Sequence, residues 1–350
     1  MARRQSVLIE PGGAGAASQK SPVLDTFELE NQATLYVGDC LELLSQIPSG
    51  AVQLVMTSPP YNIGKTYERR TGLEIYLEQQ AAVIQECARV LADGGSLCWQ
   101  VGNYLERDPD TGASEVFPLD ILFYPMIKRT GLKLRNRIIW RIEHGLNAKT
   151  RMSGRHETVL WFTKGDDYHF DLDPIRIPQK YPGKRAYQGA KAGEYSGNPL
   201  GKNPGDVWDI KDEYESNLSP ASPMWEIPNV KSNHIEKTEH PAQYPIELVE
   251  RFVLSVTRPG DLVVDPYLGS GSTGCAALLH GRRAAGAEKL PEYAEIARRR
   301  MLAAVNKQLP RRELGKPIHV PKPGSKLTVR DDAPRPEQGE GLFKDGVRDV

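Results

Sequence analysis

The chain has 350 residues, of which 39% are hydrophobic, and it carries 45 basic and 45 acidic side chains. This length allows one large domain with insertions or two smaller domains. The net charge of zero neither suggests nor excludes a polyanionic partner, so only local clusters of charge are informative. No apolar run approaches the roughly 20 residues of a membrane span, and the N-terminus has no apolar core of signal-peptide length, so secretion is not expected.

The first 170 residues divide into a leader and an alternating half. Residues 1–31 are rich in Gly, Ala, Ser and charge without periodicity, which predicts a flexible leader. From 32 to 170, β-forming runs alternate with runs of helical periodicity. This alternation predicts an α/β fold with a mostly parallel, doubly wound sheet. Strands are expected near 34–39, 52–57, 95–103, 134–145 and 156–165, and helices near 40–50, 75–92 and 119–131.

The character of the sequence changes at about residue 171. Residues 171–239 are dense in Gly, Pro, Lys, Tyr and Asn and show little periodic burial. A segment of this length without regular structure is either a linker or a functional excursion. Helices and strands return in 240–306, and residues 307–350 are rich in Pro and charge, which predicts a loosely ordered tail.

The four cysteines are scattered along the chain without a Cys-x-x-Cys pair, at Cys40, Cys87, Cys98 and Cys275. Closely spaced pairs are typical of structural zinc sites, and small secreted domains carry dense cysteine patterns. The sequence therefore favours a reducing compartment, and we expect neither a metal site nor a disulfide framework.

A glycine-rich turn lies in DLVVDPYLGSGSTG, residues 261–274, between an expected strand and the helical run CAALLHG. Gly269 and Gly271 allow a ligand to approach the backbone, and the following helix exposes free N–H donors at its start. The spacing lacks the third glycine of the dinucleotide fingerprint, and the Gly-Lys-Ser/Thr of a phosphate-binding loop is absent. The ligand is therefore expected to lack a polyphosphate.

Glu288 ends the next expected strand, near the spacing at which an acidic residue after a glycine turn binds ribose hydroxyls. The order of strand, glycine turn, helix, strand and glutamate predicts a site for a nucleoside-bearing cofactor. The alternative is that the glycines only make a tight turn and that Glu288 caps the following helix.

The strand VQLVMT ends in TSPPYN, residues 57–62. Two adjacent prolines cannot continue a strand ladder, because each lacks a backbone N–H and has a fixed φ. Ser58 then offers a hydroxyl, Pro59 a rigid carbonyl acceptor, and Tyr61 a flat face suited to stacking on a base. Two acceptors side by side suit a target with two N–H bonds, such as an exocyclic amine. A purely structural Pro-Pro turn is the alternative.

Five motifs together resemble those of the amino-directed DNA methyltransferases, which use S-adenosylmethionine to methylate adenine N6 or cytosine N4. They are YVGDC (36–40), TSPPYN (57–62), HPAQYPIELVERFV (240–253), DPYLGSGSTG (265–274) and GAEKLPEY (286–293). Their order, with the catalytic motif before the glycine turn, resembles the circularly permuted β-group of these enzymes. The resemblance covers roughly residues 34–170 and 236–300, and it implies a Rossmann-like class I methyltransferase fold.

The resemblance implies a role for each motif. Residues 171–239 would be the target-recognition region, between a catalytic half at 32–170 and a cofactor-binding half at 240–306, and the target base would be flipped out of the duplex. No covalent intermediate is required, and the Pro-Cys motif of the cytosine-C5 class is absent. The implied catalytic residues are Ser58, Pro59, Pro60 and Tyr61, and the implied cofactor-binding residues are Asp39, Asp265, Gly269, Ser270, Gly271 and Glu288.

The resemblance leaves the target base open. A serine at the first motif position is commoner in the cytosine-N4 branch and an aspartate in the adenine-N6 branch, with exceptions, so Ser58 leans the prediction slightly toward cytosine. The implied partner is double-stranded DNA. The resemblance is compatible either with a companion restriction endonuclease that the enzyme need not contact or with an orphan modification enzyme. The resemblance implies a cytoplasmic enzyme of prokaryotic or phage type, as a monomer or homodimer.

Basic side chains alternate with tyrosines in residues 178–202, where Glu194 is the only acidic residue. A basic, aromatic, Gly-rich stretch in a neutral protein suits phosphate contacts on DNA. A second basic cluster, NAKTRMSGRHE at 147–157, borders this stretch. The alternative is a solvated lysine-bearing loop. The candidate DNA-binding residues are Lys180, Lys184, Arg185 and Lys191.

Three other functions fit part of the sequence. A methyltransferase acting on RNA or a small molecule would keep the glycine turn and Glu288 but would not need residues 171–239. A non-catalytic nucleic-acid-binding module would not need an intact Ser58 and Tyr61. A nicotinamide oxidoreductase would need a fuller glycine fingerprint.

Overall fold

A single mixed sheet organises the part of the chain that the structure describes. The structure is a computed structural model, and it describes residues 21–65, 68–107, 110–112, 114–142, 148–179, 181–208, 230 and 234–314. Within these ranges the sheet has nine strands in the order β1-β2-β11-β10-β3-β4-β8-β7-β9. They are β1 (Val23–Leu24), β2 (Ala33–Val37), β3 (Val52–Thr57), β4 (Leu91–Val101), β7 (Lys133–Arg141), β8 (His156–Thr163), β9 (Val207–Trp208), β10 (Leu262–Asp265) and β11 (Arg283–Glu288).

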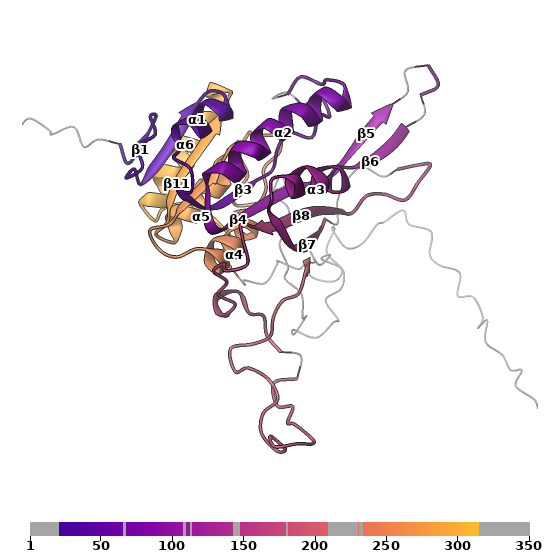
Figure 1. Cartoon of the computed structure of the whole chain (residues 1–350), viewed down its shortest axis with the longest axis vertical. Coiled ribbons are helices and arrows are strands. Elements are labelled where there is room, and N and C mark those ends of the chain that lie inside the picture. The colour runs from indigo at the N-terminus through magenta and orange to yellow at the C-terminus, as the bar shows by residue number, and fades with distance from the viewer. Residues whose placement is uncertain are drawn as a thin grey trace, which may run out of the picture.

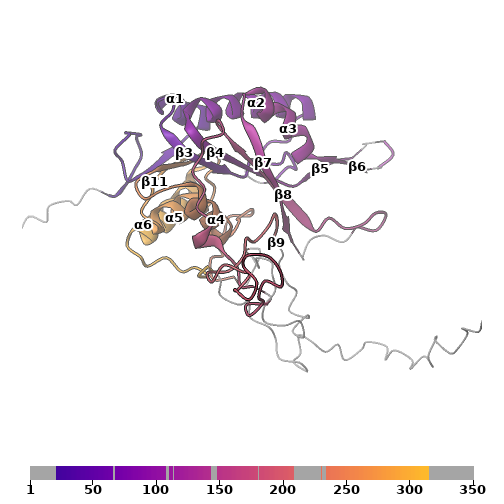
Figure 2. The ribbon, with the colours of Figure 1, turned by 60° about the horizontal axis from the view of Figure 1, so that its bottom comes forward.

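Helices cover both faces of this sheet (Figures 1 and 2). One face carries α1 (Cys40–Gln46), α2 (Leu73–Val90) and α3 (Leu119–Arg129), and the other carries α4 (Ile246–Val256), α5 (Ser272–Leu279) and α6 (Pro291–Val305). Successive strand residues point to opposite faces, so Leu54 lies in the apolar cluster under α4–α6 and Val55 in the cluster under α1–α3. None of the helices in the described ranges is long and apolar enough to cross a membrane.

The strand directions agree with the predicted α/β architecture. Strands β1, β2, β11, β10, β3 and β4 pair in parallel, whereas β8 runs antiparallel to both β4 and β7. The predicted strands and helices of both halves are present, with shifted ends. The fold is thus the mostly parallel, doubly wound sheet that the sequence predicts.

The late strands β10 and β11 lie between the early strands β2 and β3. The chain continues from β3 toward β4 on one side and from β10 toward β11 on the other, so the connections diverge between β3 and β10. In open α/β sheets, ligands bind at the carboxyl ends of strands where the connections diverge. The residues that follow Thr57 and Asp265 therefore meet at the expected ligand-binding edge.

A hairpin that the sequence did not predict projects from the sheet after β4 (Figure 1). Strands β5 (Asn103–Arg107) and β6 (Ser114–Pro118) pair antiparallel. Tyr104 anchors the hairpin, because its side chain is 1% exposed and its hydroxyl accepts a hydrogen bond from Arg70 at 3.0 Å. The hairpin depends on these contacts with the rest of the fold, which leave no periodic pattern in its own short sequence.

The predicted leader is too long, because part of residues 1–31 belongs to the sheet. Strand β1 pairs with β2, Val23 is 1% exposed in the core, and Asp25 forms an ion pair with Arg298 of α6. Two apolar residues are too few to show periodicity, which is why the sequence did not reveal this strand. Residues 1–20 lie outside the described ranges.

The described start of the predicted tail, residues 307–314, also packs on the domain. Arg311 pairs with Glu250 at 2.6 Å, and Arg312 pairs with Glu247. Both glutamates are on α4 and at most 1% exposed, so these arginines neutralise buried carboxylates. The prediction of loose order was wrong for this stretch, and residues 315–350 lie outside the described ranges.

The described residues of the region 171–239 have little regular structure, but those near its two ends dock on the domain. A 3₁₀ turn, η1 (Asp173–Ile175), and strand β9 are the regular elements among its described residues, and β9 pairs in parallel with β7. Ile175 and Ile177 are buried in the apolar cluster under α4–α6. The middle of the region extends away from the sheet (Figure 1).

The burial of β1 predicts a stability effect. Val23→Ala should lower the free energy of unfolding by about 1–2 kcal/mol, because it removes two methyl groups from a packed site. Leu29→Ala is the matched control in the same segment, since Leu29 is 39% exposed. Urea denaturation of both variants measures the difference, and equal effects would contradict the docking of residues 21–31.

Candidate active site

The first part of the candidate site is the turn that follows β3. Ser58 is half-buried, Pro59 is buried, and the Pro60 carbonyl accepts a hydrogen bond from Tyr76 of α2 at 2.7 Å. Since the Pro60 carbonyl is engaged by Tyr76, the turn is fixed from behind, and the preceding carbonyl of Pro59 is the one predicted to serve as an acceptor.

Asn62 ends this turn in the left-handed region, at φ 58°. Asparagine tolerates this conformation better than most residues. Its buried side chain donates to the Thr71 carbonyl at 2.7 Å and accepts from the Thr71 amide at 2.8 Å. Asn62 therefore ties the end of this turn to Thr71, which is an ordinary structural role for an asparagine.

Tyr61 lies in a fitted position against β4 and β8. A Cβ atom at Gly102 would come within 3.2 Å of the Tyr61 ring, so a larger residue there would crowd the ring. The Tyr61 hydroxyl lies 3.2 Å from Ser58 Oγ and donates to Glu157 Oε2 at 3.3 Å. Gln100 of β4 also donates to Glu157 Oε2. The turn thus presents two connected hydroxyls in front of a carboxylate.

Glu157 and Gln100 were missed by the sequence analysis, which read HETVLWF only as a strand. Burial raises the pKa of Glu157 above that of an ordinary carboxyl, and hydrogen bonds from Gln100 and Tyr61 oppose the shift. The available signal was a glutamate entering an otherwise apolar strand, which is costly unless the carboxyl has a partner. The pairing of β8 with β4, which the sequence does not reveal, supplies that partner.

Asp265 connects the turn after β3 to the glycine turn. Its carboxylate is 0% exposed and accepts from Thr57 Oγ1 at 2.6 Å, from the Tyr244 hydroxyl at 2.8 Å and from the Tyr267 amide at 3.0 Å. Burial raises the pKa of Asp265, and these hydrogen bonds oppose the shift. The structure therefore surrounds this predicted cofactor-binding side chain with donors from the protein itself.

The glycine turn itself requires its glycines. Gly269 and Gly271 have φ of 53° and 82°. A Cβ at Gly269 would lie 3.2 Å from His240 Nε2, and one at Gly271 would lie 3.1 Å from Ala297 of α6. Both the left-handed backbone and the close neighbours exclude other residues. Ser270 between them is buried, and its carbonyl accepts from Arg300 at 2.6 Å.

Glu288 lies at the end of β11, beside the glycine turn. Its carboxylate accepts from the Gly269 amide at 3.0 Å and from the Leu290 amide at 2.9 Å. Leu290 is the N-cap of α6, so Glu288 does support the helix start, as the alternative reading proposed. Each oxygen of a carboxylate has two acceptor positions, so capacity remains for the hydroxyls of a ribose. Burial raises the pKa of Glu288.

Asp39 lies just after the end of β2, the strand that pairs with β11. The Gly38 amide donates to the Glu288 carbonyl at 3.0 Å, which holds the two strand ends together. The Asp39 side chain accepts from the Leu41 amide at 2.9 Å, caps α1, and lies 3.8 Å from Lys289 Nζ. Carboxylate acceptors and the backbone of the glycine turn thus gather at three adjacent strand ends. This combination of groups fits a nucleoside-bearing cofactor without a polyphosphate. Among the residues that the structure places, no His, Cys, Asp or Glu cluster is arranged to hold a metal ion.

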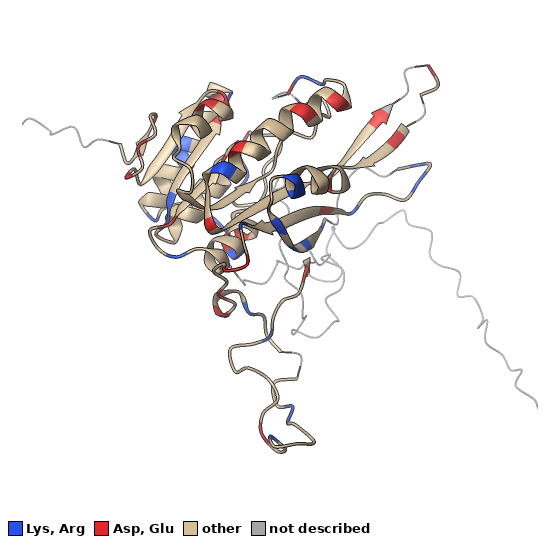
Figure 3. Cartoon of the chain, in the orientation of Figure 1, with Lys and Arg blue, Asp and Glu red and all other residues tan. Residues whose placement is uncertain are grey.

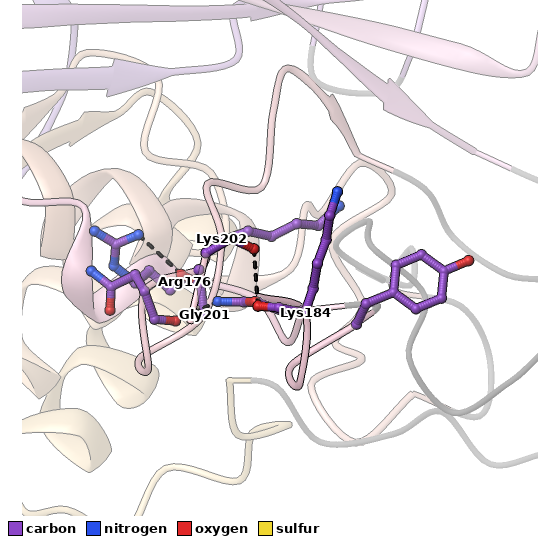
Figure 4. Close-up of a pocket in the computed structure, with 9 residues that line it drawn as sticks. Arg176, Lys184, Gly201 and Lys202 are labelled. Atoms are coloured by element: carbon purple, nitrogen blue, oxygen red, sulfur yellow. Dashed lines mark hydrogen bonds between the residues drawn. The ribbon is translucent and has the colours of Figure 1, made fainter. Parts of the chain in front are cut away.

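The described candidates for DNA binding, Lys184, Arg185 and Lys191, lie between η1 and β9, in the stretch that extends away from the sheet. Lys184 lines a cavity of about 360 Å³ together with Arg176 and Lys202 (Figure 4). None of the described side chains that line it is acidic. The Arg185 guanidinium packs 4.2 Å from the centre of the Tyr195 ring and is part of the local structure. Lys191 is exposed, and Lys180 lies outside the described residues.

Comparison with known proteins identifies the family. A family model described as DNA methylase, of the N6/N4 type, matches residues 52–299. Type II methyltransferase M.BglII of Bacillus subtilis is 47% identical over 272 residues, which are 78% of this chain and 69% of the relative. DNA adenine methyltransferase YhdJ of Escherichia coli (strain K12) is 30% identical over 276 residues, 77% of this chain and 82% of the relative.

A solved structure shows the same fold. Protein TTHA0409 of Thermus thermophilus, in its complex with S-adenosyl-L-methionine, superposes with a TM-score of 0.52 and 27% identity, over 81% of this chain and 99% of that protein. The family match covers both the turn after β3 and the glycine turn, so the resemblance seen in the motifs is confirmed. The chain belongs to the N6/N4 DNA methylase family.

Proposed function

We propose that the protein is a site-specific DNA methyltransferase that methylates N4 of a cytosine flipped out of duplex DNA. The observation that carries this proposal is the meeting of two motifs at neighbouring strand ends. The Ser58–Tyr61 hydroxyl pair follows β3, the glycine turn follows β10, and the hydrogen bond from Thr57 to Asp265 joins their bases at 2.6 Å.

The chemistry calls for acceptors rather than a covalent nucleophile. An exocyclic amine is a poor nucleophile because its lone pair is delocalised into the ring. Hydrogen bonds from its two N–H groups to Ser58 Oγ and the Pro59 carbonyl would favour a pyramidal nitrogen with its lone pair directed at the methyl donor. Pro60 keeps these acceptors rigid, so much of the lowering of the barrier comes from positioning.

S-adenosylmethionine is the methyl donor of this family: its carbon–sulfur bond breaks as the nitrogen–carbon bond forms, and the electron pair of the broken bond stays on sulfur. We propose that the spare acceptor positions of Glu288 bind its ribose and that Asp39 faces its adenine. Gly269, Ser270 and Gly271 give it access to the backbone. The buried Asp265 holds that turn in place instead of binding the cofactor directly.

The target base must leave the duplex to reach Ser58, at a cost of a few kcal/mol for unstacking. The Tyr61 ring is the proposed stacking surface for the flipped base. We propose that 171–239 is the target-recognition region between the catalytic half, 32–170, and the cofactor-binding half, 240–306.

The described middle of the region 171–239 and the described part of the loop between β7 and β8 both carry basic side chains (Figure 3). In this proposal Lys180, Lys184, Arg185 and Lys191 contact phosphates, with Arg185 acting from its packed position on Tyr195.

The choice of cytosine rests on Ser58, the residue type that is commoner in the cytosine-N4 branch of the family. Adenine N6 is the second candidate, because the relative YhdJ is named a DNA adenine methyltransferase. We propose a cytoplasmic role beside a restriction endonuclease of the same specificity, since the relative M.BglII is named a type II methyltransferase. This role requires no contact between the two enzymes.

Nucleoside identification tests the proposed target. DNA methylated by the purified protein, digested to nucleosides, should contain N4-methylcytosine at one short sequence context. Detection of N6-methyladenine instead would show that adenine, the second candidate, is the target base. Absence of methylated nucleosides across varied genomic DNAs, with folded protein and S-adenosylmethionine present, would refute methyltransferase activity.

Ser58→Ala tests the catalytic turn. The variant should lower the rate of methyl transfer by at least about 100-fold, because it removes one of two acceptors that position the amine. The dissociation constant for S-adenosylmethionine should stay within about twofold of the wild type. Single-turnover kinetics and calorimetry measure the two quantities, and a parallel loss of both would mean that the turn is structural.

Glu288→Gln tests the cofactor site while keeping the shape of the side chain. S-adenosylmethionine should bind about 10-fold more weakly, since charged acceptors bind hydroxyls more strongly than amides. Glu292→Gln, at an exposed glutamate in the first turn of α6, is the matched control and should bind normally. An unchanged dissociation constant for Glu288→Gln would rule out the ribose contact.

A further inference from the structure

Glu157 is a carboxylate that the hydroxyls of the catalytic turn reach. Tyr61 OH donates to its Oε2 at 3.3 Å and lies 3.2 Å from Ser58 Oγ. Both distances are longer than the usual hydroxyl hydrogen bond, and catalytic hydrogen bonds are commonly long in the absence of substrate and tighten when it binds. Ser58, Tyr61 and Glu157 thus form a row of hydrogen-bonded side chains that begins at the proposed methylation site.

An ionised carboxylate accepts hydrogen bonds and donates none, so it sets the direction of this row. With Glu157 ionised, Tyr61 directs its proton to the carboxylate, and Ser58 directs its own proton to the Tyr61 oxygen. The lone pairs of Ser58 Oγ are then free to face an amine N–H. The orientation that the reaction needs at Ser58 is therefore imposed by Glu157, two residues away along the row.

Methylation creates a proton that must leave. When the amine nitrogen gains a methyl group it becomes positively charged, and it returns to neutrality only by losing one of its two protons. We propose that Glu157 receives this proton through Tyr61 and Ser58. The inference rests on the proposed function.

The transfer balances without another reactant. The nitrogen gives its proton to Ser58 Oγ as Ser58 passes its own to Tyr61 and Tyr61 passes its own to Glu157 Oε2. Both hydroxyls end neutral, the amine ends as the neutral methylated base, and Glu157 ends as a carboxylic acid. Release of that proton to water restores the carboxylate for the next turnover.

The surroundings of Glu157 suit a proton acceptor. Gln100 of β4 donates to it, Trp140 of β7 lies opposite it, and Tyr61 is a titratable group that faces it among the described residues. Arg141 and His156 pair with each other one position away, so their side chains point to the other face of the sheet. Burial raises the pKa of Glu157, which makes its carboxylate more basic than an exposed one.

Glu157→Gln and Tyr61→Phe interrupt the row at two places with little change of shape. The glutamine oxygen can keep the hydrogen bonds from Gln100 and Tyr61 but cannot take up a proton, and phenylalanine keeps the ring of Tyr61. Each variant should lower the single-turnover rate of methyl transfer by about 100-fold, in the range of general base catalysis. The double variant should be no slower than either single one, because both act on the same proton.

The pH profile distinguishes proton acceptance from a structural role. The wild-type single-turnover rate should fall as the pH drops through the raised pKa of Glu157, since the protonated carboxyl no longer accepts. This fall in rate at low pH, the acid limb of the pH profile, should be absent in Glu157→Gln. It should be present in the control Glu78→Gln, at an exposed glutamate of α2. Binding of S-adenosylmethionine and of DNA should be unchanged in Glu157→Gln.

A second measurement needs no activity. Because its folded-state pKa is raised, Glu157 contributes stability that is fully present below the ordinary carboxyl pKa and is lost as the pH rises through the raised value. The free energy of unfolding of the wild type relative to Glu157→Gln should therefore fall with rising pH across this window. A difference that does not vary with pH would contradict a titrating Glu157.

A wild-type rate and acid limb in Glu157→Gln, together with an inactive Ser58→Ala, would overturn the inference and leave the proposed function standing. Weakened binding of S-adenosylmethionine or DNA in Glu157→Gln, in proportion to its lost rate, would overturn it in favour of a structural role. A wild-type protein that methylates no DNA would instead be a failure of the proposed function.

Discussion

The hydrogen bond from Thr57 Oγ1 to the buried Asp265 carboxylate is the constraint on which the site depends. It joins the last residue of β3 to the last residue of β10, which are 208 positions apart in the chain. A buried carboxylate is costly unless its acceptor positions are filled, and here Tyr244 and the Tyr267 amide complete the set. The hydrogen bonds to Asp265 therefore hold the turn after β3 and the glycine turn after β10 next to each other.

Which motifs meet in the site is decided by the order of the strands in the sheet and not by the order of the motifs along the chain. Strands β10 and β11 enter the sheet between β2 and β3, so motifs from the two halves lie at neighbouring strand ends. Within the region 171–239, strand β9 joins the sheet beside β7, at the edge away from β3 and β10, where the connections diverge. The stretch between η1 and β9 can therefore vary in length and charge without moving the hydroxyls or the glycine turn.

The features that the sequence predicted are those with a local cause. The double proline after β3 and the glycines at 269 and 271 impose backbone geometry by themselves, and the alternation of strands and helices is visible over many residues. The missed features depend on partners far away in the chain. Val23 is buried by its pairing with β2, and Arg312 is fixed by an acidic residue of α4. Neither partner can be identified from a short window of sequence.

Three carboxylates around the site show how burial alone does not define a role. Burial raises the pKa of Asp265, Glu157 and Glu288 alike. The donors that reach Asp265 are Thr57 Oγ1, the Tyr244 hydroxyl and the Tyr267 amide, and none of them is one of the proposed substrate-contacting residues Ser58 to Tyr61. Glu288 accepts from two backbone amides that fix its orientation, which suits a binding role. Glu157 differs from both because the hydroxyls that lead to it, Tyr61 and then Ser58, belong to the catalytic turn, and a hydroxyl can accept one proton while it gives up another. What separates a structural carboxylate from a chemically active one is thus whether its hydrogen-bond donors connect it to the reacting atoms.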